Sequence, residues 1–200
     1  MSIVYDLLAK IVFFGAIRSS QVRLLGYINA NDHVLIVGGG TGWILEEIDK
    51  MAKPLTITYV ELHAGMMAKS KKRRLTDRLQ VHFMASDIRA AALGQYDVII
   101  TNYVLDVFAE KDLEPVMNTL HEALKKDGRW IITDFVQVKH AAGKALVKLM
   151  YVFFRWTMSI EGNRLLDFEH RMAIRKFMPL ECHHFFHKMI RTCIYTRSDG

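Results

Sequence analysis

Several features that mark specialised classes of protein are scarce or absent in this sequence. It has three prolines in 200 residues and no low-complexity tract or internal repeat, which favours one folded domain over a long disordered chain. No stretch reaches the ~18 to 20 uninterrupted apolar residues of a membrane-spanning helix. Asp6 and Lys10 interrupt the apolar run near the start, and no basic leader precedes it. We therefore expect no signal peptide.

Cysteine is equally scarce. The two cysteines, Cys182 and Cys193, are too few for a disulfide framework and indicate a reducing compartment, so we expect a cytoplasmic protein. Beside Cys182, His183 and His187 would lie one turn apart on a helix, a spacing that metal sites use. No third ligand follows at a recognised spacing, and we expect no bound metal.

Positive charge is in excess, with a formal net charge of +6. The densest basic run, residues 69–74, follows Met66 and Met67 on an expected helix, so its charges suit a solvated outer face. Aromatic residues do not interleave with this run, as a base-stacking surface requires. We therefore expect no nucleic-acid partner.

Short apolar runs of strand length alternate with helix-like segments along the chain. The predicted strands cover residues 33–37, 56–61, 80–84, 97–101 and 129–136. Apolar residues then recur every three or four positions from Leu113 to Leu124, which indicates a helix with one buried face, ended by Asp127-Gly128. Buried strands joined by helical crossovers predict an α/β fold with a doubly wound, mostly parallel sheet and helices on both faces.

The first predicted strand runs directly into a glycine-rich turn, VLIVGGGTGW over residues 34–43. Glycine lets the backbone turn tightly and approach a ligand closely, and doubly wound sheets bind their ligands at this edge. A phosphate-binding P-loop needs Gly-Lys-Ser/Thr, but Trp43 follows Gly42. The dinucleotide fingerprint needs a glycine where Trp43 stands, so a nicotinamide-dependent oxidoreductase is the second reading.

Residues 34–42 resemble the first motif of class I S-adenosylmethionine-dependent methyltransferases, and three further segments match that family in order over residues 33–136. Glu61 stands where the family's acid holds the ribose hydroxyls. Asp87-Ile88 resembles the acidic and apolar pair beside the adenine, and Asn102-Tyr103 the segment facing cofactor and substrate. The resemblance thus implies an S-adenosylmethionine site formed by Gly38, Gly39, Gly40, Thr41, Gly42, Glu61, Leu62, Asp87, Ile88, Asn102 and Tyr103.

One position departs from the family pattern. Ile36 stands where the family carries an acidic residue near the methionine end of the cofactor. Glu61 and the helix that begins after Gly42 would then have to hold the cofactor without that acid. Ile36 also favours a third reading, a methyltransferase-like partner subunit that binds no cofactor.

In methyl transfer the cofactor supplies the activated carbon, while the protein aligns the nucleophile and excludes water. Two residues are candidates for a catalytic role. Tyr103 would place its aromatic face against the sulfonium, or simply pack in the core. Asp106 would act as a base toward a hydroxyl or an activated carbon, or be a helix-start carboxylate. Methyltransferases of nucleic-acid bases usually carry Asn/Asp-Pro-Pro-aromatic where this chain has residues 102–105, which disfavours such substrates.

The most apolar segment of the chain, residues 144–156, follows the fifth predicted strand. Its placement loosely resembles that of an aromatic segment in quinone-ring C-methyltransferases, where it covers a hydrophobic substrate. A core helix, a dimer face and a peripheral membrane contact explain the segment equally well.

These observations predict a single S-adenosylmethionine-dependent methyltransferase domain over residues 1–200, acting by O- or C-methylation on a small hydrophobic molecule. Residues 1–32 would form a helical cap, residues 33–136 the cofactor-binding core, and residues 137–200 the substrate-side helices and final strand. After a helix-like stretch around Glu181 to His187, only one strand can be read before the chain ends. We therefore expect six main strands without the last antiparallel one, and a homodimer that covers the resulting gap.

Overall fold

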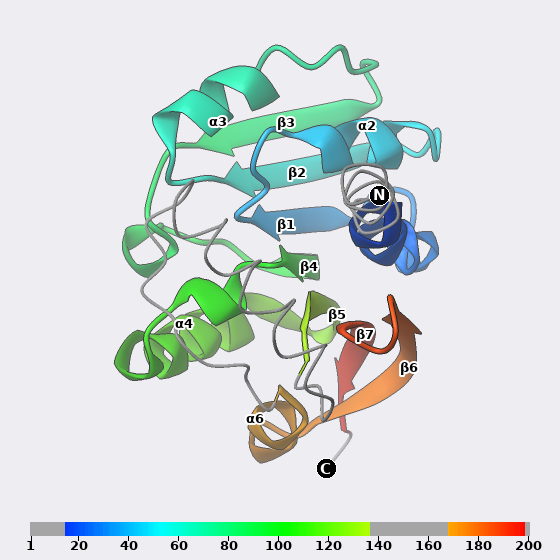
Figure 1. Ribbon diagram of the computed structural model, residues 1–200. Helices are drawn as coiled ribbons and strands as arrows, with labels where there is room; N and C mark the ends of the chain where they lie inside the picture. The colour runs from blue at the N-terminus through cyan, green and yellow to red at the C-terminus, as the bar shows by residue number, and fades with distance from the viewer. Residues whose placement is uncertain (1–14, 137–167, 199–200) are drawn as a thin grey trace, which may run out of the picture.

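The computed structural model describes residues 15–136 and 168–198 (Figure 1). The strands are β1 (His33–Val37), β2 (Leu55–Val60), β3 (Leu79–Met84), β4 (Tyr96–Asn102), β5 (Leu124–Phe135), β6 (Phe177–Phe185) and β7 (Ile190–Arg197). The α-helices include α2 (Trp43–Asp49), α3 (Ala64–Ser70), α4 (Glu110–Ala123) and α6 (Phe168–Ile174). Short 3₁₀ turns are η1 (Leu25–Tyr27), η2 (Ile88–Ala90) and η3 (Leu105–Val107), and residues 15–22 are helical.

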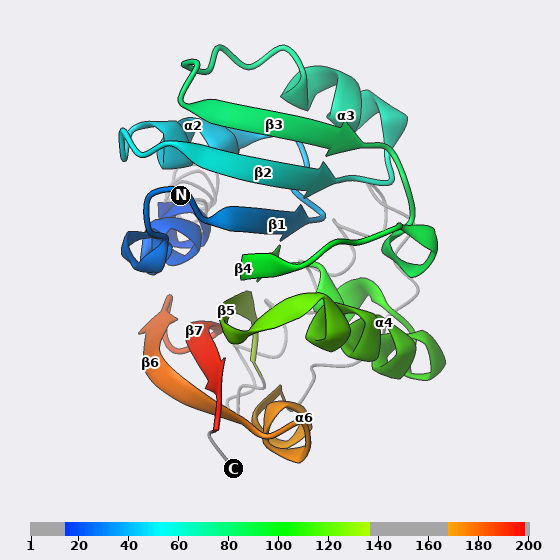
Figure 2. The same cartoon turned by 180° about the vertical axis from the view of Figure 1, so that it is seen from behind.

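The seven strands of the described residues form one sheet in the order β3-β2-β1-β4-β5-β7-β6. The strands from β3 to β5 run parallel, and β7 lies antiparallel between β5 and β6. Figure 2 shows β3, β2 and β1 side by side in this order, with α2 behind them. The predicted doubly wound α/β fold is confirmed. Strand order reverses between β1 and β4, so a ligand site is expected at the carboxyl ends of these two strands.

The parallel strands are apolar because both faces of the sheet are covered. Leu35 and Val37 of β1 belong to the core that contains α4 and α6. Val34 and Ile36 belong to the core on the other face, which contains α2 and the side chains of Leu24 and other residues before β1. Side chains that alternate along β1 therefore contribute to the cores on both faces of the sheet. With both faces covered, the carboxyl edge is the side of the sheet left for a ligand.

The predicted absence of the last antiparallel strand is wrong. The segment expected to be helical near Glu181 is strand β6, which pairs with β7 through a turn at Phe186, His187 and Lys188, all with positive φ. β6 is an edge strand with a register shift between Pro179 and Glu181, and most of its side chains are partly or fully exposed. It therefore lacks the apolar run that reveals a strand.

The complete sheet also removes the reason given for a homodimer, because β7 fills the place beside β5.

The two histidines considered for a metal site do not share a helix. His183 lies on β6, paired with Glu181, and His187 lies in the turn, so the helical spacing assumed for them does not occur. The apolar segment 144–156 lies outside the described residues. Within the described ranges, no helix is both long and apolar enough to cross a membrane.

The two cysteines are not free, contrary to the expectation from their scarcity. Cys182 on β6 lies directly opposite Cys193 on β7, and the two form a disulfide. Their separation of 11 residues gives no sign of this contact until the hairpin register is known. The inference of a reducing compartment, which depended on unpaired cysteines, loses its support.

Reduction of this disulfide should destabilise the protein. Closing an 11-residue separation restricts the unfolded chain, so reduction should lower the free energy of unfolding by up to about 3 kcal/mol. The measurement is chemical unfolding with and without reductant, and a Cys182→Ala/Cys193→Ala variant should show no effect of reductant. Two titratable thiols per chain in protein purified without reductant would contradict the pairing.

Candidate functional site

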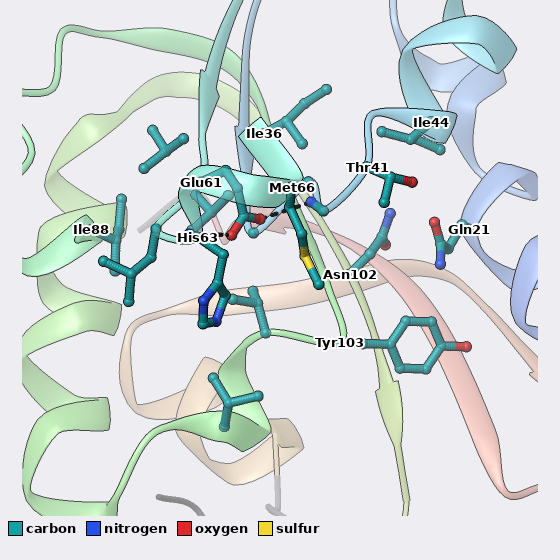
Figure 3. Close-up of a pocket in the computed structure, with 18 of the residues that line it drawn as sticks. Gln21, Ile36, Thr41, Ile44, Glu61, His63, Met66, Ile88, Asn102 and Tyr103 are labelled. Atoms are coloured by element: carbon teal, nitrogen blue, oxygen red, sulfur yellow. Dashed lines mark hydrogen bonds between the residues drawn. The ribbon is translucent and has the colours of Figure 1, made fainter. Parts of the chain in front are cut away.

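A cavity of about 490 Å³ opens at the carboxyl edge of the sheet, where strand order reverses (Figure 3). Its walls come from the loops after β1, β2, β3 and β4 and from the helix over residues 15–22. The walls include ten of the eleven residues predicted for the cofactor site: Gly38, Gly39, Gly40, Thr41, Glu61, Leu62, Asp87, Ile88, Asn102 and Tyr103. The predicted residues from four segments of the sequence thus share one cavity.

The glycine loop is built for close contact with its neighbours. A Cβ at Gly39 would lie 2.2 Å from the Tyr59 ring, so any larger residue here would have to displace a buried tyrosine. Gly42 has a φ of +77° and precedes α2, where a Cβ would lie 2.7 Å from Ser70. Gly42 does not line the cavity, and its glycine is required by this packing and backbone conformation.

Glu61 ties the loop after β1 to the loop after β2. One carboxylate oxygen, Oε2, accepts a hydrogen bond from the Gly40 N–H at 2.8 Å, and Oε1 accepts one from the His63 N–H at 2.8 Å. The residue is only 5% exposed, although it lines the cavity. Each carboxylate oxygen can accept a further hydrogen bond, so the Glu61 side chain could accept hydrogen bonds from two hydroxyl groups.

The loop after β3 supplies a second carboxylate and an apolar surface. Both carboxylate oxygens of Asp87 accept hydrogen bonds from the Arg89 guanidinium, and these bonds hold the pKa of Asp87 below its ordinary value. Ile88 is buried, whereas Leu62, which also lines the cavity, is 60% exposed. Two aliphatic side chains next to a carboxylate can hold a flat heterocycle that carries an amino group.

Tyr103 sits at the end of β4 in a left-handed conformation, with a φ of 54°. Its hydroxyl group hydrogen-bonds to Ser20 Oγ at 2.7 Å, and its ring packs against Phe135 with 4.8 Å between the centroids. Burial raises the pKa of the Tyr103 hydroxyl well above its usual value. The tyrosine is therefore neutral, and its hydroxyl is already engaged with the helix over residues 15–22.

Asp106 is not on the cavity wall. It lies in η3 and is buried next to Asp134 of β5, which is 1% exposed. Burial, with the negative charge of Asp106 beside it, raises the pKa of Asp134 well above its usual value. The structure thus places Asp106 in a buried pair of acids, whereas its predicted role as a base would require contact with a substrate.

Several wall residues were not predicted from the sequence. The helix over residues 15–22 contributes Arg18 and Gln21, and the Arg18 guanidinium lies 5.0 Å from the centroid of the Trp43 ring. His63 and Met66 project from the loop and helix after β2, as Figure 3 shows. The sequence did carry a signal for His63 and Met66, because they follow the end of a strand. It carried none for Arg18 and Gln21, because only tertiary contacts bring their helix over the edge of the sheet.

Comparisons with known proteins give one family model and several curated relatives. The family described as "Methyltransferase domain" matches residues 35–130. A carboxy-S-adenosyl-L-methionine synthase of Nautilia profundicola is 21% identical over 153 residues, which cover 75% of this chain and 65% of the relative. A malonyl-[acyl-carrier protein] O-methyltransferase of Priestia megaterium is 30% identical over 110 residues, which cover 54% of this chain and 39% of the relative. The chain thus matches less than two thirds of the length of either relative.

Solved structures extend the likeness to most of the fold. The mitomycin 7-O-methyltransferase MmcR superposes with a TM-score of 0.69 at 17% identity, covering 90% of this chain and 53% of that one. The 1,6-didemethyltoxoflavin-N1-methyltransferase of Burkholderia thailandensis, solved with S-adenosylhomocysteine, superposes with a TM-score of 0.67 at 16% identity. The match covers 98% of this chain and 88% of that one. At these identities the likeness shows a shared fold.

The raised pKa of Asp134 makes stability depend on pH. A carboxyl group with a raised folded-state pKa adds stability below its unfolded pKa of about 3.9, and this stability is lost as pH rises. Asp134→Asn should therefore be more stable than the wild type at pH 8, and the difference should shrink toward pH 4.

Urea unfolding at several pH values measures this difference. Asp127→Asn, which changes an exposed aspartate, is the matched control and should follow the wild type at every pH. An Asp134→Asn variant that is less stable than the wild type at pH 8 would contradict the burial of a protonated acid.

Proposed function

We propose that this chain is a class I S-adenosylmethionine-dependent methyltransferase that methylates a small hydrophobic acceptor, because its residues 35–130 match the methyltransferase-domain family. The observation that carries this proposal is the cavity itself. It collects the loops after four adjacent strands at the point where strand order reverses. The activity of the whole protein is part of the proposal, since the curated relatives extend well beyond the matched region.

The cavity suits an extended cofactor laid along the edge of the sheet. Asp87 and Ile88 after β3 would hold the adenine, and Glu61 after β2 would accept the two ribose hydroxyls. The methionine end would then lie at the glycine loop after β1 and at Asn102 of β4. Each part of the cofactor meets a group of suitable chemistry in this order, which supports the assignment.

When bound, S-adenosylmethionine supplies an activated methyl carbon, so the protein need mainly position the acceptor and exclude water. Tyr103 presents an aromatic ring at the methionine end, with its hydroxyl held by Ser20. Val104, Val107 and Phe108 form an apolar wall after β4. An apolar wall favours a hydrophobic acceptor whose reactive oxygen or carbon faces the methyl group, without requiring a base.

Among the alternatives, an NAD(P)-dependent oxidoreductase is opposed by Trp43, which lines the cavity where the dinucleotide fingerprint has a glycine. A non-catalytic partner subunit is favoured only by Ile36.

The substrate-side role of residues 137–200 and the predicted homodimer remain predictions. Light scattering at micromolar concentration measures whether the protein is a dimer.

Titration calorimetry with S-adenosylhomocysteine separates these functions. We expect one binding site per chain and no heat with NAD at the same concentration. Heat from NAD but not from millimolar S-adenosylhomocysteine would favour the oxidoreductase. No heat from either would favour the partner subunit. Transfer of labelled methyl groups to hydroxylated and quinone-like acceptors then identifies the substrate class.

Glu61→Ala should weaken S-adenosylhomocysteine binding by ~2 to 3 kcal/mol, or roughly 30- to 150-fold in Kd. The variant loses the acceptor for the ribose hydroxyls and also the bonds that hold Gly40 and His63. Calorimetry gives the Kd, and Glu47→Ala, which removes a surface partner of Lys50, is the control. Unchanged affinity in Glu61→Ala would mean that the ribose lies elsewhere.

A further inference from the structure

The cavity has an apolar side chain at the position where the family pattern that this sequence resembles has an acid. Ile36 of β1 lines the cavity and is 2% exposed. An isoleucine offers no hydrogen-bond acceptor to the α-ammonium group of S-adenosylmethionine. If the methionine end binds here, as the proposed function requires, another group must accept from that ammonium, because a buried cation without a partner is unfavourable.

Asn102 is in the right place to do so. β1 and β4 are parallel neighbours, with Ile36 opposite Ile100 and Val37 opposite Thr101. Because side chains alternate along a strand, Asn102 projects from the same face as Ile100 and Ile36, one step nearer the carboxyl edge. Figure 3 shows its amide directed toward Thr41, on the side of the cavity that Gln21 also faces.

The amide of Asn102 also has an unsatisfied atom. Its oxygen, Oδ1, is buried, and among residues 15–136 and 168–198 no group donates a hydrogen bond to it. A buried amide oxygen without a donor is unfavourable, so no hydrogen bond to this oxygen holds the amide in its present orientation. Rotation about the Cβ–Cγ bond exchanges the oxygen with the similarly sized amide nitrogen, and so can turn the oxygen toward the cavity.

We propose that the Asn102 side-chain oxygen accepts a hydrogen bond from the α-ammonium of S-adenosylmethionine and replaces the acid absent at Ile36. The order of the strands supports this position. If Asp87 after β3 and Glu61 after β2 hold the adenine and ribose, the amino-acid end reaches the edge of β1 and β4. The proposal rests on the proposed function, because it concerns the same cofactor.

The test compares two ligands by calorimetry. S-adenosylhomocysteine carries the ammonium, whereas 5′-S-(3-carboxypropyl)-5′-thioadenosine keeps the carboxylate and lacks the ammonium. The wild type should prefer S-adenosylhomocysteine by about tenfold or more, as a hydrogen bond to a charged group gives. Asn102→Leu should bind S-adenosylhomocysteine about tenfold more weakly and should bind the other ligand within twofold of the wild type.

Two further variants sharpen the test. Asn102→Asp keeps the shape and places a negative charge beside the ammonium, so its preference for S-adenosylhomocysteine should exceed that of the wild type. Gln21→Leu removes another neutral acceptor on that side of the cavity and should leave the preference unchanged. Thermal unfolding confirms that each variant is folded, and if Asn102→Leu does not fold, Asn102→Asp alone decides.

The outcomes separate this proposal from the proposed function. Wild-type protein that binds neither ligand would overturn both. Wild-type protein that binds both ligands equally, or an Asn102→Leu variant that loses the same factor for each, would overturn the role of Asn102 while leaving the cofactor site intact. A preference lost in Gln21→Leu would assign the ammonium to Gln21 instead.

Discussion

The candidate site depends on one carboxylate that joins two loops. Glu61 receives the N–H of Gly40 with one oxygen and the N–H of His63 with the other. Without these bonds the glycine loop would be held by the Gly38 N–H, which donates to the Val60 carbonyl, and by Tyr59, whose hydroxyl donates to the Gly40 carbonyl. Arg73 also donates hydrogen bonds to the carbonyl and the hydroxyl of Thr41. The spacing between the loops after β1 and β2, and hence the width of the cavity, therefore depends on the position of a buried acid.

Much of the fold could be predicted because its parallel strands are covered on both faces. The first strand was placed at its observed bounds, and the next four within a few residues, except that β5 starts earlier, at Leu124. The helix before β5 ends at Ala123, short of the expected Asp127-Gly128. By contrast, β6 was missed because its side chains are mostly exposed and its pairing partner, β7, follows it in the sequence.

The site was predictable to the extent that its residues follow strand ends in the sequence. Ten of eleven predicted cofactor residues line the cavity, and Gly42 has a packing role instead. Arg18 and Gln21 could not be found in this way, since only tertiary packing brings their helix over the edge. Asp134 gave a signal that was not used, an acid inside an apolar strand, but its pairing with Asp106 requires the folded chain.

The irregular outer strand has a consequence for solubility. Strand β6 forms one border of the sheet and carries exposed apolar side chains, including Met178 and Leu180. A regular border of this kind would offer free N–H and C=O groups to other chains and invite aggregation. Pro179 has no N–H to donate, and the shift of register beside it breaks the spacing that an incoming strand would need. The register shift in β6 thus disfavours the addition of strands from other molecules at this edge of the sheet.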